Sequence, residues 1–184
     1  MKLASLYSGG KDSNYSIFKI NRLGHDVACL ISIIPEISDS LLFHFPNIHL
    51  TRVLAEAIDL PIRDFKSKTS SLENEIAVLE NALSSVKDEF GIEGIVHGGI
   101  SSNFQKRNFE KICSDLELSV FSPLWNLNPS NYLRRMIDEK FKIIITGVSA
   151  MGLDREWLGI QLDYESVQRL ESLSSKYGFN LNFE

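Results

Sequence analysis

The segment Ser8-Gly9-Gly10-Lys11-Asp12-Ser13 follows directly on the apolar run Lys2-Leu-Ala-Ser-Leu-Tyr7. This order predicts a short strand, a glycine-rich turn and a helix that begins at Asp12 or Ser13. Backbone N–H groups in such a turn, together with the positive end of the helix dipole, form a site for an anion. Two adjacent glycines let the backbone approach a phosphate closely, and the lysine and serines add a charge and hydroxyl donors. The segment therefore predicts a phosphate-binding turn, with a Gly-Gly turn that only caps a helix as the alternative.

A Walker A loop is a common sequence of this type, but its template does not fit here. Its first glycine would stand at Ser5, and Asp12 occupies the position at which Ser or Thr holds magnesium. The pattern S-G-G-x-D-S instead resembles the PP-loop ATP pyrophosphatases residue for residue. Those enzymes hold the β,γ-diphosphate of ATP and release it as pyrophosphate, so the resemblance implies chemistry at the α-phosphorus.

Length and composition limit the classes of protein that need to be considered. The chain has 184 residues, enough for one domain with a sizeable core or one domain with a small appendage, and its net charge of −5 disfavours a general nucleic-acid binder. Cys29 and Cys113 form no C-x-x-C pair, so we expect two small buried residues rather than a zinc site or a disulfide framework. No export signal and no apolar stretch of about 20 residues is present, so we expect a cytoplasmic protein without membrane contact.

Apolar runs alternate with segments of helical period, which predicts an α/β fold with a doubly wound, mainly parallel sheet. Strands are expected at Leu3–Tyr7, Val27–Ile34, Pro61–Phe65, Gly94–His97, Leu118–Phe121 and Lys142–Val148. Helices are expected at Asn14–Leu23, Thr51–Ile58, Ser71–Phe90, Ser102–Leu116, Pro129–Glu139 and Tyr164–Lys176. The stretch Leu124–Pro129 breaks the alternation. We therefore expect a PP-loop ATP-binding domain at residues 1–124 and a smaller, substrate-side C-terminal subdomain at residues 125–184.

A second glycine pair, Gly98-Gly99, follows the fourth expected strand and precedes Ser101. Because the carboxyl ends of parallel strands share one edge of a sheet, this turn is expected to lie beside the first and to line the nucleotide or substrate pocket. An ordinary turn with a serine cap on the next helix is the alternative. Lys106 and Arg107 place cations in the first turns of that helix, against its dipole, which favours a nearby anion.

Aromatic residues mark two further candidate segments. The stretch 35–49 has no regular pattern, and Phe43 and Phe45 flank His44 there, so that they could close over a purine or a peptide; loop packing is the alternative. His44 and His49 are five residues apart with no carboxylate to complete a set, so metal binding is not expected. Trp125 follows a strand end and is expected at the same edge of the sheet, with burial in the core as the alternative.

Further segments extend the resemblance over nearly the whole chain. They are Phe43-His-Phe-Pro-Asn-Ile-His49, Gly98-Gly-Ile-Ser-Ser102, Gln105-Lys-Arg107, Pro123-Leu-Trp125, Gly147-x-x-Ala-Met-Gly-Leu-Asp154 and Trp157-Leu-Gly159. In this order they resemble the archaeal and eukaryotic diphthine–ammonia ligases, a branch of the PP-loop ATPases. The resemblance implies an adenine nucleotide alpha hydrolase-like (HUP-type) fold. It also implies ATP-dependent amidation of diphthine, the modified histidine of elongation factor 2, with ammonium as nitrogen donor and AMP and pyrophosphate as products.

The resemblance implies roles for individual residues as well. The substrate carboxylate is expected to attack the α-phosphorus, and ammonia to open the acyl-adenylate that forms. The expected ATP-binding residues are Ser8, Gly9, Gly10, Lys11, Asp12, Ser13, Gly98, Gly99 and Ser101. The expected catalytic residues are Lys11, which would offset the charge of the leaving pyrophosphate, and Asp12, which would orient magnesium. The expected substrate-binding residues are His44, Asn47, Gln105, Arg107 and Trp125.

Two other functions fit parts of the pattern. One is a PP-loop enzyme that modifies tRNA. The net negative charge and the absence of a cysteine pair disfavour it, so no nucleic acid is expected as a partner. The other is a nucleotide-binding protein without turnover. Members of the resembled family usually continue into a Glu-Gly-Gly-Glu segment, whereas this chain stops at Asn180-Leu-Asn-Phe-Glu184, as a truncated or shortened member would. The oligomeric state, a homodimer included, and the source of ammonia are left open.

Overall fold

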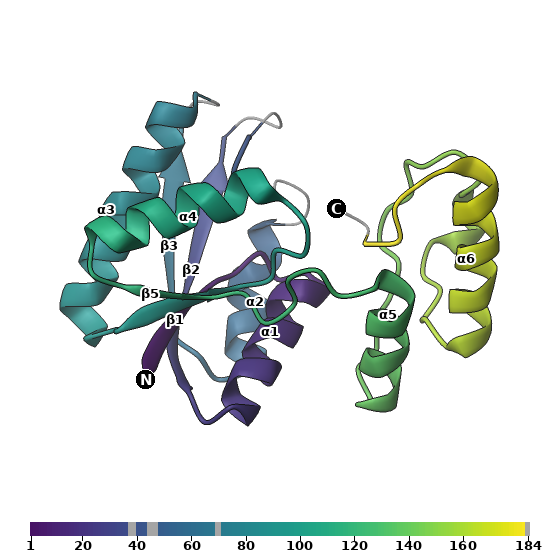
Figure 1. Ribbon diagram of the computed structural model, residues 1–184, viewed down its shortest axis with the longest axis horizontal. Coiled ribbons are helices and arrows are strands. Elements are labelled where there is room, and N and C mark those ends of the chain that lie inside the picture. The colour runs from purple at the N-terminus through teal and green to yellow at the C-terminus, as the bar shows by residue number, and fades with distance from the viewer. Residues whose placement is uncertain (37–39, 44–47, 69–70, 183–184) are drawn as a thin grey trace. The chain divides into compact units, whose positions relative to one another are not determined.

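A computed structural model describes the chain except for residues 37–39, 44–47, 69–70 and 183–184 (Figure 1). The chain divides into two compact units, Met1–Trp125 and Asn126–Glu184. This division falls one residue after the boundary expected from the sequence, so that Trp125 belongs to the first unit. Within the described ranges, no helix is both long enough and apolar enough to cross a membrane.

The first unit is built on a parallel sheet of five strands in the order β3-β2-β1-β4-β5. The strands are β1 (Lys2–Leu6), β2 (Asp26–Pro35), β3 (Ile62–Ser67), β4 (Gly94–His97) and β5 (Ser119–Phe121). The first five expected strands are therefore confirmed within one or two residues at each end. Their unbroken apolar runs agree with a sheet that is covered on both faces.

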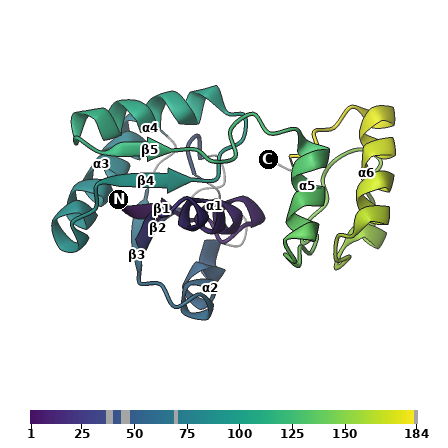
Figure 2. The ribbon, with the colours of Figure 1, turned by 60° about the horizontal axis from the view of Figure 1, so that its bottom comes forward.

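Helices cover both faces of this sheet, which confirms the doubly wound arrangement (Figure 2). The helices α1 (Lys11–Arg22) and α2 (Thr51–Ala57) pack on one face, and α3 (Leu72–Phe90) and α4 (Asn103–Asp115) pack on the other. Successive strand residues point to opposite faces. In β1, Leu3 packs in the core with α1 and α2, and Ala4 packs in the core with α3 and α4.

The helix α3 shows how the sequence sets the packing. Its apolar residues recur at spacings of four and three, and Leu79, Leu83 and Val86 are fully buried against the sheet. The helix begins after Ser71, whose side chain accepts a hydrogen bond from the Asn74 N–H at 3.3 Å. A serine in this position satisfies one of the first N–H groups of the helix, which have no partner within it.

The strand order places the first turn at the switch point of the sheet. From β1 the chain proceeds to β2 and β3 on one side, and it then returns to add β4 and β5 on the other side. In sheets of this kind, ligands bind beyond the carboxyl ends of the two strands at which the order reverses. Here these strands are β1 and β4, and the two glycine-rich turns follow them directly.

The second unit contains α5 (Pro129–Asp138), the short helix η2 (Arg155–Trp157) and α6 (Tyr164–Tyr177). Leu133 on α5 and Leu170 on α6 are fully buried. The Arg134 guanidinium donates hydrogen bonds to both carboxylate oxygens of Glu171, at 2.6 and 2.7 Å, and so connects α5 to α6. Such a two-point contact fixes the orientation of both side chains.

The strand expected at Lys142–Val148 is wrong. Only an isolated antiparallel bridge, Ile144 to Gln161, forms there. The Ile143 side chain is buried, but Ile144 is 54% exposed, so the apolar run does not lie inside a covered sheet. An apolar run predicts a strand only where neighbouring strands are available to pair with it, and the second unit supplies a single short segment, residues 159–162.

Both cysteines are buried free thiols, as the sequence predicts. Cys29 lies on β2 and Cys113 on α4, and both belong to the core between the sheet, α3 and α4. Burial raises the pKa of each thiol to about 12, so neither is a thiolate at neutral pH. They act as small apolar residues.

Loss of the cap on α3 should destabilise the first unit. Ser71→Ala removes the acceptor of the Asn74 N–H and should lower the free energy of unfolding by about 1 kcal/mol in urea denaturation. Ser84→Ala, on the exposed side of the same helix, is the matched control and should leave stability unchanged or slightly higher, because alanine favours helix. Equal losses in the two variants would contradict the role of the cap.

Candidate active site

The backbone of the first turn is shaped by its two glycines. Gly9 has φ +77°, a left-handed conformation that favours glycine, and a Cβ there would lie 2.7 Å from Leu54 Cδ1 of α2. Gly10 is the N-cap of α1, which starts at Lys11, whereas the sequence predicted a start at Asp12 or Ser13. The turn thus leads directly into a helix whose positive end lies at the carboxyl end of β1, which is the arrangement that binds phosphate.

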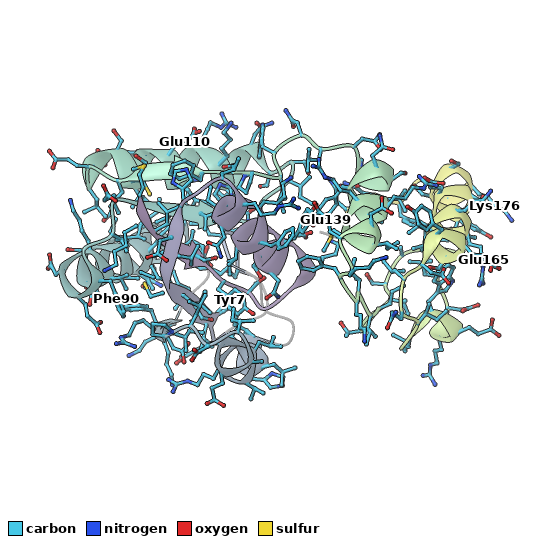
Figure 3. The ribbon with its side chains drawn as sticks, turned by 90° about the horizontal axis from the view of Figure 1, so that it is seen from below. Tyr7, Phe90, Glu110, Glu139, Glu165 and Lys176 are labelled. Carbon is cyan, nitrogen blue, oxygen red and sulfur yellow. The ribbon has the colours of Figure 1, made fainter. Side chains whose placement is uncertain are left out.

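Side chains of the turn hold its peptide groups in place. The Asn14 amide nitrogen donates to the carbonyl oxygens of Gly9 and Gly10, at 3.0 and 2.9 Å. Tyr7, labelled in Figure 3, donates from its hydroxyl to the Asn14 side-chain oxygen at 3.0 Å. Because the C=O and N–H of one peptide point in opposite directions, fixing these two carbonyl groups also fixes the N–H groups of the next residues. Burial raises the pKa of Tyr7, although the bond to Asn14 opposes this, so the hydroxyl remains a donor.

Sequence reasoning missed Tyr7 and Asn14 as parts of the site. The signal for Asn14 was its place directly after the S-G-G-x-D-S pattern, in the first turn of the helix. Hydroxyl groups complete the turn: Ser13 donates to the Gly10 carbonyl oxygen at 3.0 Å, and Ser8 donates to the Ser13 hydroxyl at 3.4 Å.

Lys11 and Asp12 form an ion pair beside the turn. The Lys11 Nζ atom donates to both carboxylate oxygens of Asp12, at 2.9 and 2.8 Å. The two side chains are 14% and 21% exposed. The pair therefore keeps one positive and one negative group next to the first turn, each able to take a new partner of opposite charge.

The turn after β4 packs directly on the first turn. A Cβ at Gly98 would lie 2.6 Å from the carbonyl carbon of Asp12 and 2.7 Å from the amide nitrogen of Ser13. Only glycine allows the two backbones to approach so closely. The two turns are thus in direct contact, although Ser13 and Gly98 are 85 positions apart in the sequence. Ser102 caps α4 by accepting from the Gln105 N–H at 3.3 Å, and Ser101 is exposed on the turn.

His97 is a buried residue that sequence reasoning did not assign to the site. Its Nδ1 atom accepts a hydrogen bond from the Gly99 N–H at 3.1 Å, and its Nε2 atom lies 2.6 Å from the Ser122 hydroxyl oxygen. With Nδ1 accepting, the proton of the neutral ring is on Nε2 and is donated to Ser122. Burial, and then the charge of Lys106, lower the pKa of His97 to about 4. A neutral histidine thus joins the turn after β4 to the turn after β5.

The residues expected to bind substrate differ from one another in their contacts. His44 and Asn47 lie outside the described residues. The Gln105 side chain donates to the Leu42 carbonyl oxygen at 3.0 Å, and the exposed Arg107 donates to the Asn103 carbonyl oxygen of its own helix at 3.1 Å. Trp125 is half-buried, and its ring faces the Lys106 Nζ atom, 4.4 Å from the ring centroid.

A second buried residue, Glu75, was also missed. It is fully buried in the first turn of α3 and accepts hydrogen bonds from the N–H groups of Leu41 and Leu42, at 3.1 and 2.8 Å. Glu75 and Gln105 therefore hold this short stretch between α3 and α4. Phe43, which we expected to be exposed and able to close over a ligand, is instead half-buried, with its ring packed against the core between the sheet, α3 and α4.

Asp12 is the acidic residue of the site whose position suits a magnesium ion. Among the described residues there is no cluster of three or more His, Cys, Asp or Glu that could hold a metal ion. Magnesium that accompanies ATP is usually bound by one or two carboxylates and by the phosphates themselves. The Asp12 carboxylate, in the first turn of α1, fits this arrangement.

A doubly wound sheet with an S-G-G-x-D-S turn at its switch point defines an α/β protein of the PP-loop type. The sequence matches the diphthamide synthase N-terminal domain over residues 1–120 and the diphthamide synthase C-terminal domain over residues 128–184. The chain belongs to the diphthamide synthase family, and it is a member of a family of ligases.

Individual relatives agree with this assignment. Proteins named diphthine–ammonia ligase from Mus musculus and Homo sapiens are 33% and 32% identical to this chain, over 98% of it and 74% of each relative. The Saccharomyces cerevisiae relative of the same name is 30% identical over 88% of this chain and 28% of its own length. Among solved structures, a predicted subunit of tRNA methyltransferase from Methanocaldococcus jannaschii superposes with a TM-score of 0.50 and 15% identity, over 99% of this chain and 90% of that one. This likeness shows the fold alone.

The contact between the two turns should not tolerate a side chain. Gly98→Ala places a Cβ against backbone atoms and should lower the free energy of unfolding by about 1–3 kcal/mol, measured in urea. Gly147→Ala is the control, because a Cβ there meets no atom within 4 Å. If the two variants are equally stable, the turns are not in the contact described.

Burial of neutral His97 should make stability depend on pH. The unfolded chain holds a histidine with the ordinary pKa of 6.5, whereas folded His97 stays neutral down to about pH 4, so the unfolded state binds the extra proton between these values. The free energy of unfolding should therefore fall as the pH falls from about 6.5 to about 4, by about 3 kcal/mol, and the fall should be smaller in His97→Gln. An NMR titration that gives His97 a pKa near 6.5 would contradict this.

Proposed function

We propose that this chain amidates diphthine on elongation factor 2, using ATP and ammonium, and releases AMP and pyrophosphate in the cytoplasm. Membership in a family whose relatives are named diphthine–ammonia ligase supports the reaction. The observation that carries the proposal is the S-G-G-x-D-S turn at the switch point of the sheet, with its peptide groups fixed by Asn14. That position is where a doubly wound fold binds a nucleotide.

The β- and γ-phosphates of ATP bind to the first turn in this proposal. The N–H groups from Gly9 to Ser13 and the hydroxyls of Ser8 and Ser13 supply hydrogen-bond donors, and the start of α1 supplies positive potential. Gly98, Gly99 and Ser101 form the neighbouring wall. Because the peptide groups are held before ATP arrives, little reorganisation accompanies binding.

Lys11 and Asp12 exchange partners when ATP binds. Lys11 leaves the Asp12 carboxylate and approaches the phosphate oxygens, where its charge offsets that of the departing pyrophosphate. Magnesium would be held by Asp12 together with the phosphates, and it would supply further positive charge. The ion pair thus keeps the Lys11 ammonium and the Asp12 carboxylate next to the positions at which they act.

The chemistry runs through an acyl-adenylate. A carboxylate oxygen of diphthine forms a bond to the α-phosphorus, and the bond from that phosphorus to the bridging oxygen breaks, which releases pyrophosphate. Ammonia then attacks the acyl carbon, and the bond from that carbon to the adenylate oxygen breaks, which releases AMP. The nitrogen loses one proton to solvent, and the amide forms. The chain's main contribution is to position the reactants and stabilise charge. Both ring nitrogens of His97 are engaged, so we assign it to positioning of the turns rather than to proton transfer.

Removal of the Lys11 charge should slow the reaction. Lys11→Ala should reduce kcat by about 10²–10³, measured as pyrophosphate released in the presence of ATP, ammonium and elongation factor 2 that carries diphthine. Lys19→Ala, near the other end of the same helix, is the matched control and should retain normal turnover. Activity of Lys11→Ala close to wild type would remove Lys11 from the mechanism.

The same assay tests the reaction as a whole. Pyrophosphate formation should require both ammonium and the diphthine-carrying protein, with one amide formed for each pyrophosphate. No pyrophosphate above background would leave only a nucleotide-binding role. Tight, saturable binding of tRNA at physiological salt would instead favour a tRNA-modifying enzyme.

A further inference from the structure

One face of the Trp125 indole ring contacts a cation, and hydrogen bonds hold the turn that carries Trp125. The Lys106 Nζ atom lies 4.4 Å from the ring centroid. The backbone N–H of Trp125 donates to the Ser122 carbonyl oxygen at 3.1 Å, and the Ser122 hydroxyl is hydrogen-bonded to His97 Nε2 at 2.6 Å. The neighbouring Leu124 is fully buried. The ring therefore stands at the carboxyl end of β5, on a turn that is anchored to β4.

Lys106 has a second partner on its own helix. Its Nζ atom lies 3.8 Å from the carboxylate of Glu110, one turn further along α4. Figure 3 labels Glu110 on this helix. An ion pair at this spacing, between side chains that are 30% and 51% exposed, is weak, and a single cation–π contact of a half-buried ring is modest. Lys106 can therefore move between the two partners at little cost. The indole face is thus a cation site that an internal cation occupies and can leave.

The other tryptophan does not offer such a site. Trp157 faces the Arg169 guanidinium at 4.8 Å, but Trp157 is only 3% exposed and belongs to the interior of the second unit. Trp125 is half-buried, so a ligand can reach its ring. Because of this difference in exposure, Trp157 makes a packing contact, whereas the Trp125 ring is accessible to a ligand.

We infer, on the basis of the proposed function, that the Trp125 ring binds the trimethylammonium group of diphthine, while Lys106 moves to Glu110. A quaternary ammonium group cannot donate hydrogen bonds and is weakly hydrated, so an aromatic face is its favoured partner in proteins. Diphthine bears its carboxylate on the same carbon as this group. Holding the cation on Trp125 therefore also restricts where the reacting carboxylate can lie, and it makes Trp125 a specificity-determining residue.

Two matched peptides measure this contact directly. One carries diphthine, and the other carries the same side chain with a carbon atom in place of the quaternary nitrogen, which keeps the shape and removes the charge. By calorimetric titration, the wild type should bind the cationic peptide about 5- to 30-fold more tightly than the neutral one. Trp125→Leu should bring this ratio close to one, Trp125→Phe should keep part of it, and binding of ATP should be unchanged in both.

Removal of the internal cation should strengthen binding of the external one. Lys106→Gln should bind the cationic peptide more tightly than the wild type does and the neutral peptide equally well. Lys111→Gln is the matched control, since it removes one charge from an exposed position of the same helix that has no part in the contact. If the two variants bind the cationic peptide with equally increased affinity, the effect is due to the net charge of the protein. This result would contradict competition for the Trp125 ring.

The outcomes separate this inference from the function on which it rests. If the wild type forms amide from diphthine and Trp125→Leu keeps the full preference for the cationic peptide, the role of Trp125 is wrong and the proposed function stands. If the wild type neither binds the diphthine peptide nor releases pyrophosphate with it, the proposed function fails, and the role of Trp125 fails with it.

Discussion

The site depends on one close approach of two backbones. Gly98 brings the turn after β4 against Asp12 and Ser13 at the start of α1, at distances that no side chain would allow. The approach is possible because β1 and β4 are adjacent and parallel, so that their carboxyl ends reach the same edge of the sheet. Peptide groups of the second turn therefore support the first turn, in addition to the hydrogen bonds from the Asn14 side chain, and together they give it a fixed shape.

Buried polar groups extend this rigidity to the neighbouring segments. Asn14 fixes the first turn, His97 joins the turns after β4 and β5, and Glu75 holds the N–H groups of Leu41 and Leu42. Each is a buried or half-buried group whose hydrogen bonds replace those it would make with water. In the exchange that we propose, Lys106 and Trp125 at the edge of the sheet change partners while the frame beneath them stays in place.

Much of the fold could be predicted from local patterns, and the failures have a common cause. The spacing of apolar residues predicts α3, and the serine before it predicts its cap. The apolar run at Lys142–Val148 has the same pattern as the strands, yet it lacks neighbouring strands to pair with. The local sequence does not show whether such partners exist. For the same reason His97 and Glu75 were not assigned: a histidine or a glutamate becomes part of a site through distant partners, at Ser122 and at Leu41.

By itself, the sequence determined which groups the first turn brings together. Its glycines, hydroxyls and charges are consecutive, and local sterics and the helix dipole suffice to predict an anion site there. It also determined the family, because family motifs occur in order along the chain. Only the tertiary structure decided which distant groups support that turn. Gly98 and His97 act through contacts set by strand order, and strand order follows from packing of the whole sheet rather than from any one segment.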